Sequence, residues 1–543
     1  MSAIDSDPEQ AEIELVNGFG ADSLESTPVP HGRRTTKRWS FHNHGKPVLF
    51  DKSGGNTKRR LSDIDMVHKE IDPFHISPAQ LYSTESGRLF HAGKICIVLC
   101  GLPGRGKTHL AVSLTRYLRW LGVKTHSFHL GNYRRAKAEA DLDFELFMPR
   151  VEDNAFRQNI VGECIDDILH FFENDKGQVA IYDAVNALPE HRLELNDKFA
   201  QLNIQALFIE SLVTEDQIIS KNVEQAARSS PDYKNWDYAK AYKDYSDRIK
   251  VLTPYYLEMG DLETKLSYIK FINFGERIEL HNSNYGYLIQ KVVFYLMNSR
   301  IKSGSVFFAR CYKNDLDFSF DPPLDSDGDV YAKNLTETIL RYMKKQGKPL
   351  SLVSDRKDKE ALSLDQRHPT AGVDGTSHDS FVVWTSVKQR TIQATKYLSQ
   401  YTTNIRHRIQ LAQKNPGVAF GMTEEEIKKE FPTDYENFVK DPYHHRFSRA
   451  ESYHDLAIKI EPLILEMERM SGDILIIADE TVLRVFYGYL MSCNCYDIPS
   501  LNFATDEIIE IKFNAYYNSA KVIPIKDFSS SANALALVSP ESL

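Results

Sequence analysis

The junction between a short strand and a glycine-rich octapeptide constrains the fold of this chain more than any other feature. Lys94–Cys100 (KICIVLC) has the composition of a buried strand, and it leads directly into Gly101–Thr108 (GLPGRGKT). The octapeptide fits the pattern G-x-x-x-x-G-K-[ST], in which glycines let successive backbone N–H groups surround phosphate oxygens. Apolar residues then recur at helical spacing up to Gly122, and the positive end of the expected helix favours the same anion. The order strand, loop, helix predicts a phosphate-binding site in an α/β domain.

Two side chains of the octapeptide carry the expected chemistry. Lys107 reaches the terminal phosphates, and Thr108 supplies a hydroxyl ligand for Mg²⁺. The predicted phosphate site therefore consists of Gly101, Leu102, Pro103, Gly104, Arg105, Gly106, Lys107 and Thr108. The alternative interpretation, a glycine-rich turn before an ordinary helix, gives Lys107 no purpose.

Composition excludes several classes of protein. The chain has 543 residues, enough for two or three domains, and its net charge of −9 gives no electrostatic footprint for nucleic acid. The longest purely apolar run, residues 95–100, is far too short to span a membrane. Residues 1–20 are acidic and lack the apolar core of a secretory signal, and the six cysteines show no metal-ligand spacing. We expect a cytoplasmic protein with reduced thiols and with neither nucleic acid nor membrane as a partner.

The sequence pattern divides the chain into four parts. Residues 1–85 lack lasting periodicity and are rich in Ser, Asp, Pro, Gly and charge, which predicts a disordered regulatory tail. Strand and helix signals alternate over 86–300, the rhythm of a parallel sheet covered by helices. A second α/β unit covers 301–525 and contains a polar insertion at about 344–380. Residues 526–543 are expected to form a flexible C-terminal tail.

Individual elements follow from the same periodicity. In the first α/β unit we expect strands at 94–100, 123–130, 178–183, 203–210 and 271–274, and a long helix at 153–172. In the second unit we expect strands at 305–310, 381–385, 406–411 and 473–478, and helices at 423–430, 452–470 and 480–491.

A basic cluster in the tail precedes a serine. The residues Arg59-Arg60-Leu61-Ser62 resemble a site for a basophilic protein kinase of the cyclic-AMP-dependent type. Phosphorylation of Ser62 would reverse the local charge, and a regulatory protein kinase is therefore a candidate partner. The alternative interpretation, a solvated basic tail, remains open.

Charged residues at strand ends extend the predicted site. Asp183 closes the strand at 178–183, where its carboxylate would face the loop and hold Mg²⁺ or orient an acceptor hydroxyl. Arg134 and Arg135 follow the second strand, and guanidinium groups near a phosphate loop suit a second anion such as a sugar phosphate. Arg248 is a third candidate for that anion. A solvated helix start is the alternative interpretation of each arginine.

Many separate segments of the chain together resemble one family. GLPGRGKTHLAVSLTRYLRWLGVKT, FHLGNYRR, IYDAVN, FIESL, SSPDYKN and YLMN look like the kinase half of the bifunctional 6-phosphofructo-2-kinase/fructose-2,6-bisphosphatase family. WTSVKQRTIQAT, ESYHDL and TVLR are similar in order and spacing to its histidine-phosphatase half, so the resemblance covers roughly residues 90 to 515.

The resemblance implies a fold, a reaction and a partner. It implies a P-loop kinase domain with a parallel sheet, followed by a histidine-phosphatase-like (phosphoglycerate-mutase-like) α/β domain. The implied reaction is the phosphorylation of the 2-hydroxyl of fructose 6-phosphate by ATP with Mg²⁺, and the implied partner is a second copy in a homodimer. Carried over by position, Asn222 joins the octapeptide in binding ATP, Lys107 and Asp183 are catalytic, and Thr108 and Asp183 serve Mg²⁺. Arg134, Arg135 and Arg248 then hold the sugar phosphate.

The kinase half departs from the family pattern on the acceptor side. Val185 replaces a threonine that would touch the sugar, and Leu252 stands where a tyrosine is expected. Ala227 replaces a lysine, with Arg228 beside it as a possible substitute. Val213 stands in place of a cysteine. The residues that the family uses to bind ATP are present, whereas several of those that it uses to bind fructose 6-phosphate are replaced.

The phosphatase half departs from the family at its catalytic residues. The family forms a phosphohistidine in an Arg-His-Gly motif, and this chain has Arg310-Cys311-Tyr312. Asp479 stands where a second histidine is expected, and Gln413 replaces the general-acid glutamate. The arginines that match phosphate-clamping positions are Arg310, Arg390 and Arg446. Because neither Cys311 nor Asp479 has an imidazole, we expect no phosphatase activity toward fructose 2,6-bisphosphate.

Cys311 is not predicted to replace the missing histidine as a nucleophile. Thiol phosphatases use the pattern C-x₅-R, whose arginine holds the thiolate and the phosphate. Asp317 occupies that position here.

Three hypotheses follow from the sequence. The leading one is an ATP-dependent sugar-phosphate kinase, in its simplest form a 6-phosphofructo-2-kinase with an inactive phosphatase domain. The second is a non-catalytic regulator that binds ATP or a sugar phosphate, which Val185, Ala227 and Leu252 favour. The third, a working bifunctional enzyme, requires a phosphatase without its histidines.

Overall fold

The computed structural model describes residues 67, 77–79, 93–137, 155–282, 286–300, 304–312, 321–353, 381–514 and 516–525. These residues belong to one compact unit that spans Gly55–Leu543. Ser62, nearly all of the predicted tail at 1–85, most of the predicted insertion at 344–380 and the C-terminal tail at 526–543 lie outside the described residues.

The first sheet has the strand order β2-β3-β1-β4-β5-β6. Strands β1 to β5 pair in parallel, and β6 runs antiparallel to β5 at the edge. Their bounds are β1 Lys94–Cys100, β2 Thr125–His129, β3 Val179–Asp183, β4 Ile204–Leu212, β5 Tyr268–Ile272 and β6 Arg277–His281. The central strand β1 is buried on both faces, as its nearly continuous apolar run predicts.

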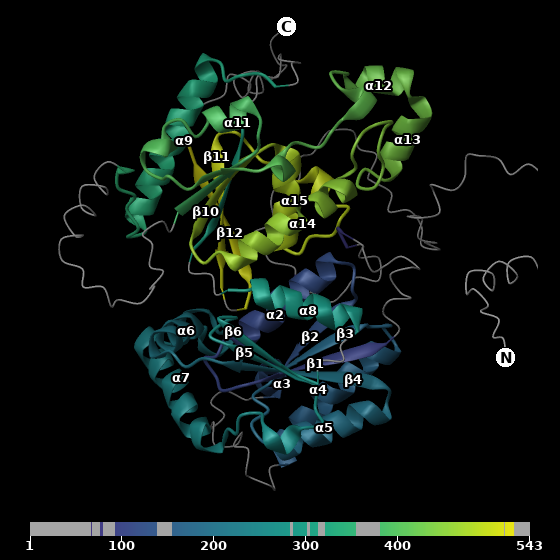
Figure 1. Cartoon of the computed structure of the whole chain (residues 1–543), viewed down its shortest axis with the longest axis vertical. Coiled ribbons are helices and arrows are strands. Elements are labelled where there is room, and N and C mark those ends of the chain that lie inside the picture. Colours follow the sequence, from purple (N-terminus) through teal and green to yellow (C-terminus); the bar gives the residue numbers. More distant parts are fainter. Residues whose placement is uncertain are drawn as a thin grey trace, which may run out of the picture. The chain divides into compact units, whose positions relative to one another are not determined.

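Helices cover both faces of this sheet. Ile95, Ile97 and Leu99 pack against α2 and α8, whereas the alternate residues of β1 pack against α4 and α5 (Figure 1). The helices are α2 Lys107–Trp120, α3 Leu130–Lys137, α4 Ala155–Glu173, α5 Pro189–Gln201, α6 Asp216–Ser229, α7 Tyr238–Leu252 and α8 Tyr287–Asn298. This two-sided covering follows from the βαβ rhythm of the sequence.

The second sheet has the order β12-β11-β7-β10-β8-β9. Strands β7 to β10 are parallel, and the hairpin of β11 and β12 adds two antiparallel strands beside β7. Their bounds are β7 Val306–Arg310, β8 Phe381–Thr385, β9 Ile405–His407, β10 Asp473–Ala478, β11 Glu507–Phe513 and β12 Asn518–Pro524.

Helices also cover both faces of the second sheet. Phe308 and Ile476 pack toward α14 and α15, and the neighbouring Phe307 and Leu475 pack toward α9. The helices are α9 Ser326–Lys345, α11 Gln389–Gln393, α12 Glu424–Glu430, α13 Pro432–Lys440, α14 Tyr453–Arg469 and α15 Glu480–Leu490. The predicted α/β class is confirmed for both units.

A single apolar core joins the two units. It includes residues of α2 and α8 from the first unit and of α14 and α15 from the second. The ring of Trp120 meets that of Tyr489 edge-on with 5.5 Å between centroids. The hydroxyl of Tyr117 donates to Oε1 of Glu461 across the same boundary at 3.4 Å. The second unit is therefore packed onto the first, rather than tethered to it by the linker alone.

Two predicted strands were wrong in part. The strand expected at 271–274 lies at Tyr268–Ile272, because Asn273 and Phe274 adopt positive φ angles and turn the chain into β6. Of the strand expected at 406–411, only Arg406 and His407 belong to a strand, β9, and Ile409–Leu411 forms a 3₁₀ turn. The sequence analysis also missed β6, β11 and β12.

All six cysteines are buried thiols. Among the helices that the structure describes, none is both long enough and apolar enough to cross a membrane.

Candidate active site

The octapeptide follows β1 as a loop whose glycines adopt backbone angles that other residues avoid. Gly106 has a φ of 77°, and a Cβ placed there would lie 2.3 Å from the ring of Phe274. Gly101 has a φ of 132°, and a Cβ there would lie 2.5 Å from the carbonyl oxygen of Ser211. A side chain at either position would strain the backbone and clash with its neighbour. Glycine is therefore required for the path of this loop.

Helix α2 begins at Lys107 with its first N–H groups available to a ligand. Gly106 caps the helix without a side-chain hydrogen bond, and the first turn holds no acidic residue. The first N–H groups of a helix have no partner within it, and the helix dipole makes this end positive. A phosphate is the kind of ligand that such an end binds.

Lys107 is buried against the loop. Its side chain leaves the residue 8% exposed, and Nζ donates to the carbonyl oxygen of Leu102 at 2.8 Å. Burial lowers the pKa of Lys107 to about 8, although the nearby carboxylate of Asp183 acts in the opposite direction. A bound phosphate would supply the counter-charge that a buried lysine needs.

Asp183 ends β3 beside the loop. Its Oδ2 accepts a hydrogen bond from the hydroxyl of Thr108 at 2.7 Å and lies 2.8 Å from Nδ1 of His129. Burial by itself would raise the pKa of Asp183, but the hydrogen bond and charge of His129 and the charge of Lys107 lower it overall. The carboxylate is therefore ionised at neutral pH.

The Thr108 hydroxyl and the Asp183 carboxylate fit a magnesium ion. Both are hard oxygen donors, and Mg²⁺ in nucleotide sites takes its other ligands from phosphates and water. Within the described ranges, no group of three or more His, Cys, Asp or Glu side chains is placed to hold a metal by itself. The donor set thus suits an ion that binds together with a nucleotide.

Asp232 gathers the three arginines that were predicted to hold a sugar phosphate. Its carboxylate pairs with Arg134, with Nη1 of Arg135 at 2.6 Å and with Nη1 of Arg248 at 3.0 Å. Nε of Arg248 also pairs with Asp244 at 2.8 Å. Burial would raise the pKa of Asp232, but Arg134 and Arg135 hold it well below its ordinary value. Guanidinium groups gathered in this way are the groups that bind a phosphate anion most strongly.

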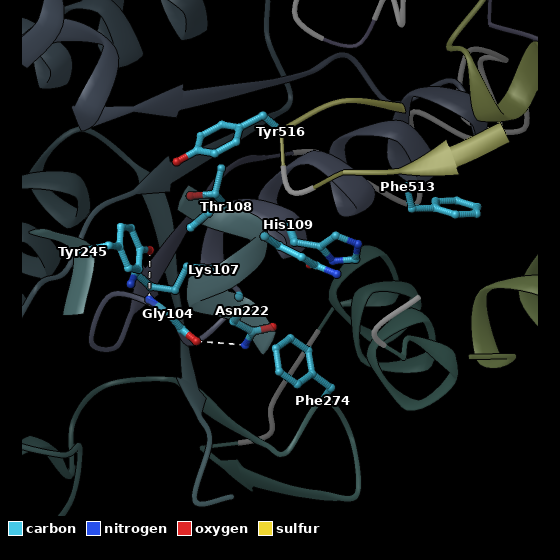
Figure 2. Close-up of a pocket in the computed structure, with 12 residues that line it drawn as sticks. Gly104, Lys107, Thr108, His109, Asn222, Tyr245, Phe274, Phe513 and Tyr516 are labelled. Atoms are coloured by element: carbon cyan, nitrogen blue, oxygen red, sulfur yellow. Dashed lines mark hydrogen bonds between the residues drawn. The ribbon is translucent and has the colours of Figure 1, made fainter. Parts of the chain in front are cut away.

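A pocket opens beside the loop. Four predicted loop residues line it, namely Gly104, Gly106, Lys107 and Thr108, together with the predicted Asn222. Asn222 Nδ2 donates to the carbonyl oxygen of Gly104 at 2.8 Å, and the Gly104 N–H donates to the hydroxyl of Tyr245 at 3.0 Å (Figure 2). These bonds hold the loop open toward the pocket.

The β11–β12 hairpin of the second sheet contributes to the same pocket. Phe513 ends β11 and Tyr516 lies in the turn before β12, and both line the pocket. Figure 2 shows Tyr516 reaching from this hairpin to the side of Thr108. The Tyr516 hydroxyl donates a long hydrogen bond of 3.4 Å to Oγ of Ser230, which also accepts from the backbone N–H of Asp232. Tyr516 therefore lies between the loop and the arginine cluster.

A second group of predicted residues meets at the carboxyl ends of β7, β8 and β10. Arg310 ends β7, and the backbone N–H of Cys311 donates to the carbonyl oxygen of Ala478 at 2.9 Å, just before Asp479. Arg390 on α11 donates to Oε1 of Gln413 at 2.7 Å and lies 3.7 Å from Asp479.

Acidic side chains compensate the arginines of this second site. Arg310 lies 3.4 Å from Glu480, and Arg390 lies near Asp479. Arg446 pairs instead with Asp455 at 3.5 Å, and its side chain is 63% exposed. The structure thus brings Arg310, Cys311, Arg390, Gln413 and Asp479 into one region and gives Arg446 a different partner.

Comparison with known proteins identifies a different family model in each of the two α/β units. A family model described as 6-phosphofructo-2-kinase matches residues 82–303, and one described as Histidine phosphatase superfamily (branch 1) matches residues 373–524. A Saccharomyces cerevisiae protein provisionally named 6-phosphofructo-2-kinase/fructose-2,6-bisphosphatase is 40% identical over 521 residues, which cover 94% of this chain and 97% of that protein. The chain belongs to the 6-phosphofructo-2-kinase/fructose-2,6-bisphosphatase family. The resemblance seen in the sequence is thereby confirmed.

Members of this family carry names that state different activities. A Saccharomyces cerevisiae fructose-2,6-bisphosphatase is 31% identical over 80% of this chain and 88% of its own length. Human 6-phosphofructo-2-kinase/fructose-2,6-bisphosphatase 4 is 29% identical over 82% of this chain and 88% of its own length. Among solved structures, the α-ribazole phosphatase from Shigella flexneri matches 40% of this chain and 96% of its own length, with 16% identity and a TM-score of 0.30. Family membership alone therefore does not decide which activity this chain has.

The structure shows where the altered residues of this family member lie. Ala227 is buried next to Tyr233 and Ala241, and Leu252 is 4% exposed. The guanidinium group of Arg228 lies over the ring of Tyr238, 4.7 Å from its centroid, on the exposed side of α6. Arg228 therefore stacks on an aromatic ring at the surface, whereas Ala227 is buried in an apolar cluster.

The sequence did not predict several residues of the first site, among them His129, Tyr245, Phe274, Phe513 and Tyr516. His129 could have been found from its place near the end of the strand predicted at 123–130. Parallel strands have their carboxyl ends on the same side of the sheet, so the ends of β2 and β3 lie together. The other four come from segments far from the loop in sequence, and no motif marks them.

The buried lysine predicts proton uptake when a nucleotide binds. Near pH 8 about half of the Lys107 side chains are unprotonated in the free protein, and a phosphate raises the pKa again. We expect magnesium-saturated ATP to bind with uptake of about half a proton at pH 8, and with weakening affinity from pH 7 to 9. Calorimetry in buffers of different ionisation enthalpy measures this uptake.

The matched control for this prediction is the same titration at pH 6.5, where Lys107 is protonated before and after binding. Equal proton exchange at pH 6.5 and pH 8 would show that Lys107 does not carry the effect.

Proposed function

We propose that this protein is an ATP-dependent 6-phosphofructo-2-kinase that phosphorylates the 2-hydroxyl of fructose 6-phosphate. The observation that carries the proposal is that Tyr516 connects two complementary anion sites: it lines the pocket of the phosphate loop, and its hydroxyl donates to Ser230 beside Asp232 and its arginines. The phosphate loop with Lys107 lies on one side, and the arginines around Asp232 lie on the other, with Tyr516 between them. A nucleotide and a sugar phosphate would then meet beside Asp183.

The side chains divide the work of phosphoryl transfer between them. Lys107 would neutralise charge on the transferring group, and the loop N–H groups would hold the nucleotide phosphates. Asp183, ionised and buried, would accept the hydrogen bond of the acceptor hydroxyl and orient it for attack. Mg²⁺, bound next to Thr108 and Asp183, supplies further positive charge to the phosphates. Arg134, Arg135 and Arg248 would bind the 6-phosphate of the sugar.

A kinase assay tests this proposal. We expect ATP, Mg²⁺ and fructose 6-phosphate to yield fructose 2,6-bisphosphate, measured in a coupled assay. Lys107→Ala removes the charge nearest the terminal phosphates and should lower kcat by at least about 100-fold. Product no higher than in the Lys107→Ala variant would rule the proposal out.

A second candidate function is a non-catalytic regulator that binds ATP or a sugar phosphate. Buried Ala227 and outward-facing Arg228 favour it, because the expected cation is missing from the acceptor side. Tight ATP binding by calorimetry without turnover of any hexose phosphate would select this function. Measurable turnover would eliminate it.

We also propose that the second site has no fructose-2,6-bisphosphatase activity. Cys311 is 3% exposed and packs with Tyr331 and Leu335, so its thiol is not presented to a phosphate. Asp479 caps α15 by accepting from the N–H of Thr481 at 3.0 Å, and its charge opposes that of Arg390. A site whose arginines are already compensated attracts a phosphate weakly.

Phosphate release from fructose 2,6-bisphosphate checks this second proposal. We expect no release above the uncatalysed background, and no change in the Cys311→Ser variant. Release that disappears in Cys311→Ser would instead establish a working bifunctional enzyme with a thiol nucleophile.

We further propose a homodimer formed through the edge of the first sheet. Strand β6 is the edge strand, and apolar side chains are exposed on it and on α8, namely Leu280 (47%), Phe294 (48%) and Met297 (57%). Edge strands with exposed apolar neighbours are natural pairing surfaces. Sedimentation should give twice the chain mass, and Phe294→Glu with Met297→Glu should give the monomer. A wild-type monomer at micromolar concentration would contradict this arrangement.

Regulation through the tail and a cytoplasmic location remain parts of the proposal. Ser62 would be the target of a basophilic protein kinase. Five residues further along, the carbonyl oxygen of Val67 accepts from Nη1 of Arg119 at 2.8 Å, so the chain reaches α2 soon after this serine.

A further inference from the structure

A histidine to which the sequence assigns no role, His129, touches the candidate catalytic carboxylate. His129 is the last residue of β2, and Asp183 is the last residue of its neighbour β3. The two residues are direct partners in the parallel register, so their side chains leave the sheet on the same face. Both are 7% exposed, and Nδ1 of His129 lies 2.8 Å from Oδ2 of Asp183.

The chemistry of the pair decides which atom donates. An ionised carboxylate can only accept, so the proton lies on Nδ1 of His129. The other ring nitrogen, Nε2, lies 3.1 Å from Oγ of Ser127, which is two residues earlier on the same face of β2. In the neutral imidazole this nitrogen accepts from the Ser127 hydroxyl. The ring is therefore held at both nitrogens.

The contacts of Asp183 converge on one of its two oxygens. Thr108 donates to Oδ2, and His129 donates to the same atom. The carboxylate is thereby anchored through Oδ2, and rotation about its last bond would break both hydrogen bonds. These two hydrogen bonds leave Oδ1 as the oxygen that can accept from an acceptor hydroxyl.

We propose that His129 is a positioning residue for the transfer reaction, which holds the Asp183 carboxylate so that Oδ1 is aimed at the acceptor hydroxyl. This inference rests on the proposed kinase function. In this role His129 does more than fill space in the core, because without its N–H donor the Asp183 carboxylate could rotate. The nucleotide loop would lose only the Thr108 hydrogen bond and keep its own contacts at Gly104 and Leu102.

Two substitutions separate positioning from mere filling of space. His129→Asn keeps an N–H donor close to the place of Nδ1, whereas His129→Leu keeps the bulk and removes the donor. In His129→Leu we expect kcat to fall about 10- to 100-fold, with the KM for ATP and the affinity for a non-hydrolysable ATP analogue within about threefold of wild type. His129→Asn should restore kcat to within about fivefold of wild type.

The control is His170→Leu, an exposed histidine on α4 that should leave every parameter unchanged. A wild-type kcat in His129→Leu would overturn the proposal. So would equal losses in the leucine and asparagine variants, or a parallel fall of kcat, analogue affinity and melting temperature, which would indicate a structural role.

A spectroscopic measurement keeps this inference separate from the proposed function. If wild type fails to phosphorylate fructose 6-phosphate, the proposed function is wrong, and histidine-selective ¹⁵N NMR still tests the contact. We expect His129, assigned by its loss in His129→Asn, to be the Nδ1–H tautomer and to change tautomer in Asp183→Ala. An Nε2–H tautomer in wild type would overturn the donation to Asp183 and with it the positioning role.

Discussion

The parallel register of β1, β2 and β3 is the constraint on which the candidate site depends. Strand β3 lies between β2 and β1. The carboxyl ends of the three parallel strands therefore place His129, Asp183 and the start of the phosphate loop next to one another. Side chains alternate along each strand, so a slip of one residue would turn Asp183 into the opposite core. The buried apolar residues of these strands hold the register, and the chemistry at the edge follows from their packing.

Burial shifts the pKa values of the charged groups at the carboxyl ends of these strands. Lys107 loses water and has its pKa lowered to about 8, whereas Asp183 stays ionised because His129 and Lys107 outweigh the effect of its own burial. At the second site, carboxylates lie close to the arginines. Glu480 lies near Arg310, and Asp479 lies near Arg390. The candidate phosphate loop thus holds a buried lysine with a lowered pKa, whereas two arginines of the second site already lie close to carboxylates.

The second domain has a physical connection to the first site. The two domains share one apolar core around Trp120 and Tyr489, and the hairpin of β11 and β12 brings Phe513 and Tyr516 into the nucleotide pocket. The second domain therefore helps to shape the pocket beside the loop of the first domain.

The sequence alone determined the phosphate loop, the strand that ends at Asp183, the α/β class and the family, because each is written in residues close together along the chain. It could not assign partners that are distant in sequence. Only the tertiary structure gathered Arg134, Arg135 and Arg248 around Asp232, turned Arg228 onto Tyr238, and placed His129 and Tyr516 in the site. The physical reason is that strand order and the packing of helices on the sheets decide which strand ends and turns meet, and local patterns do not encode that order.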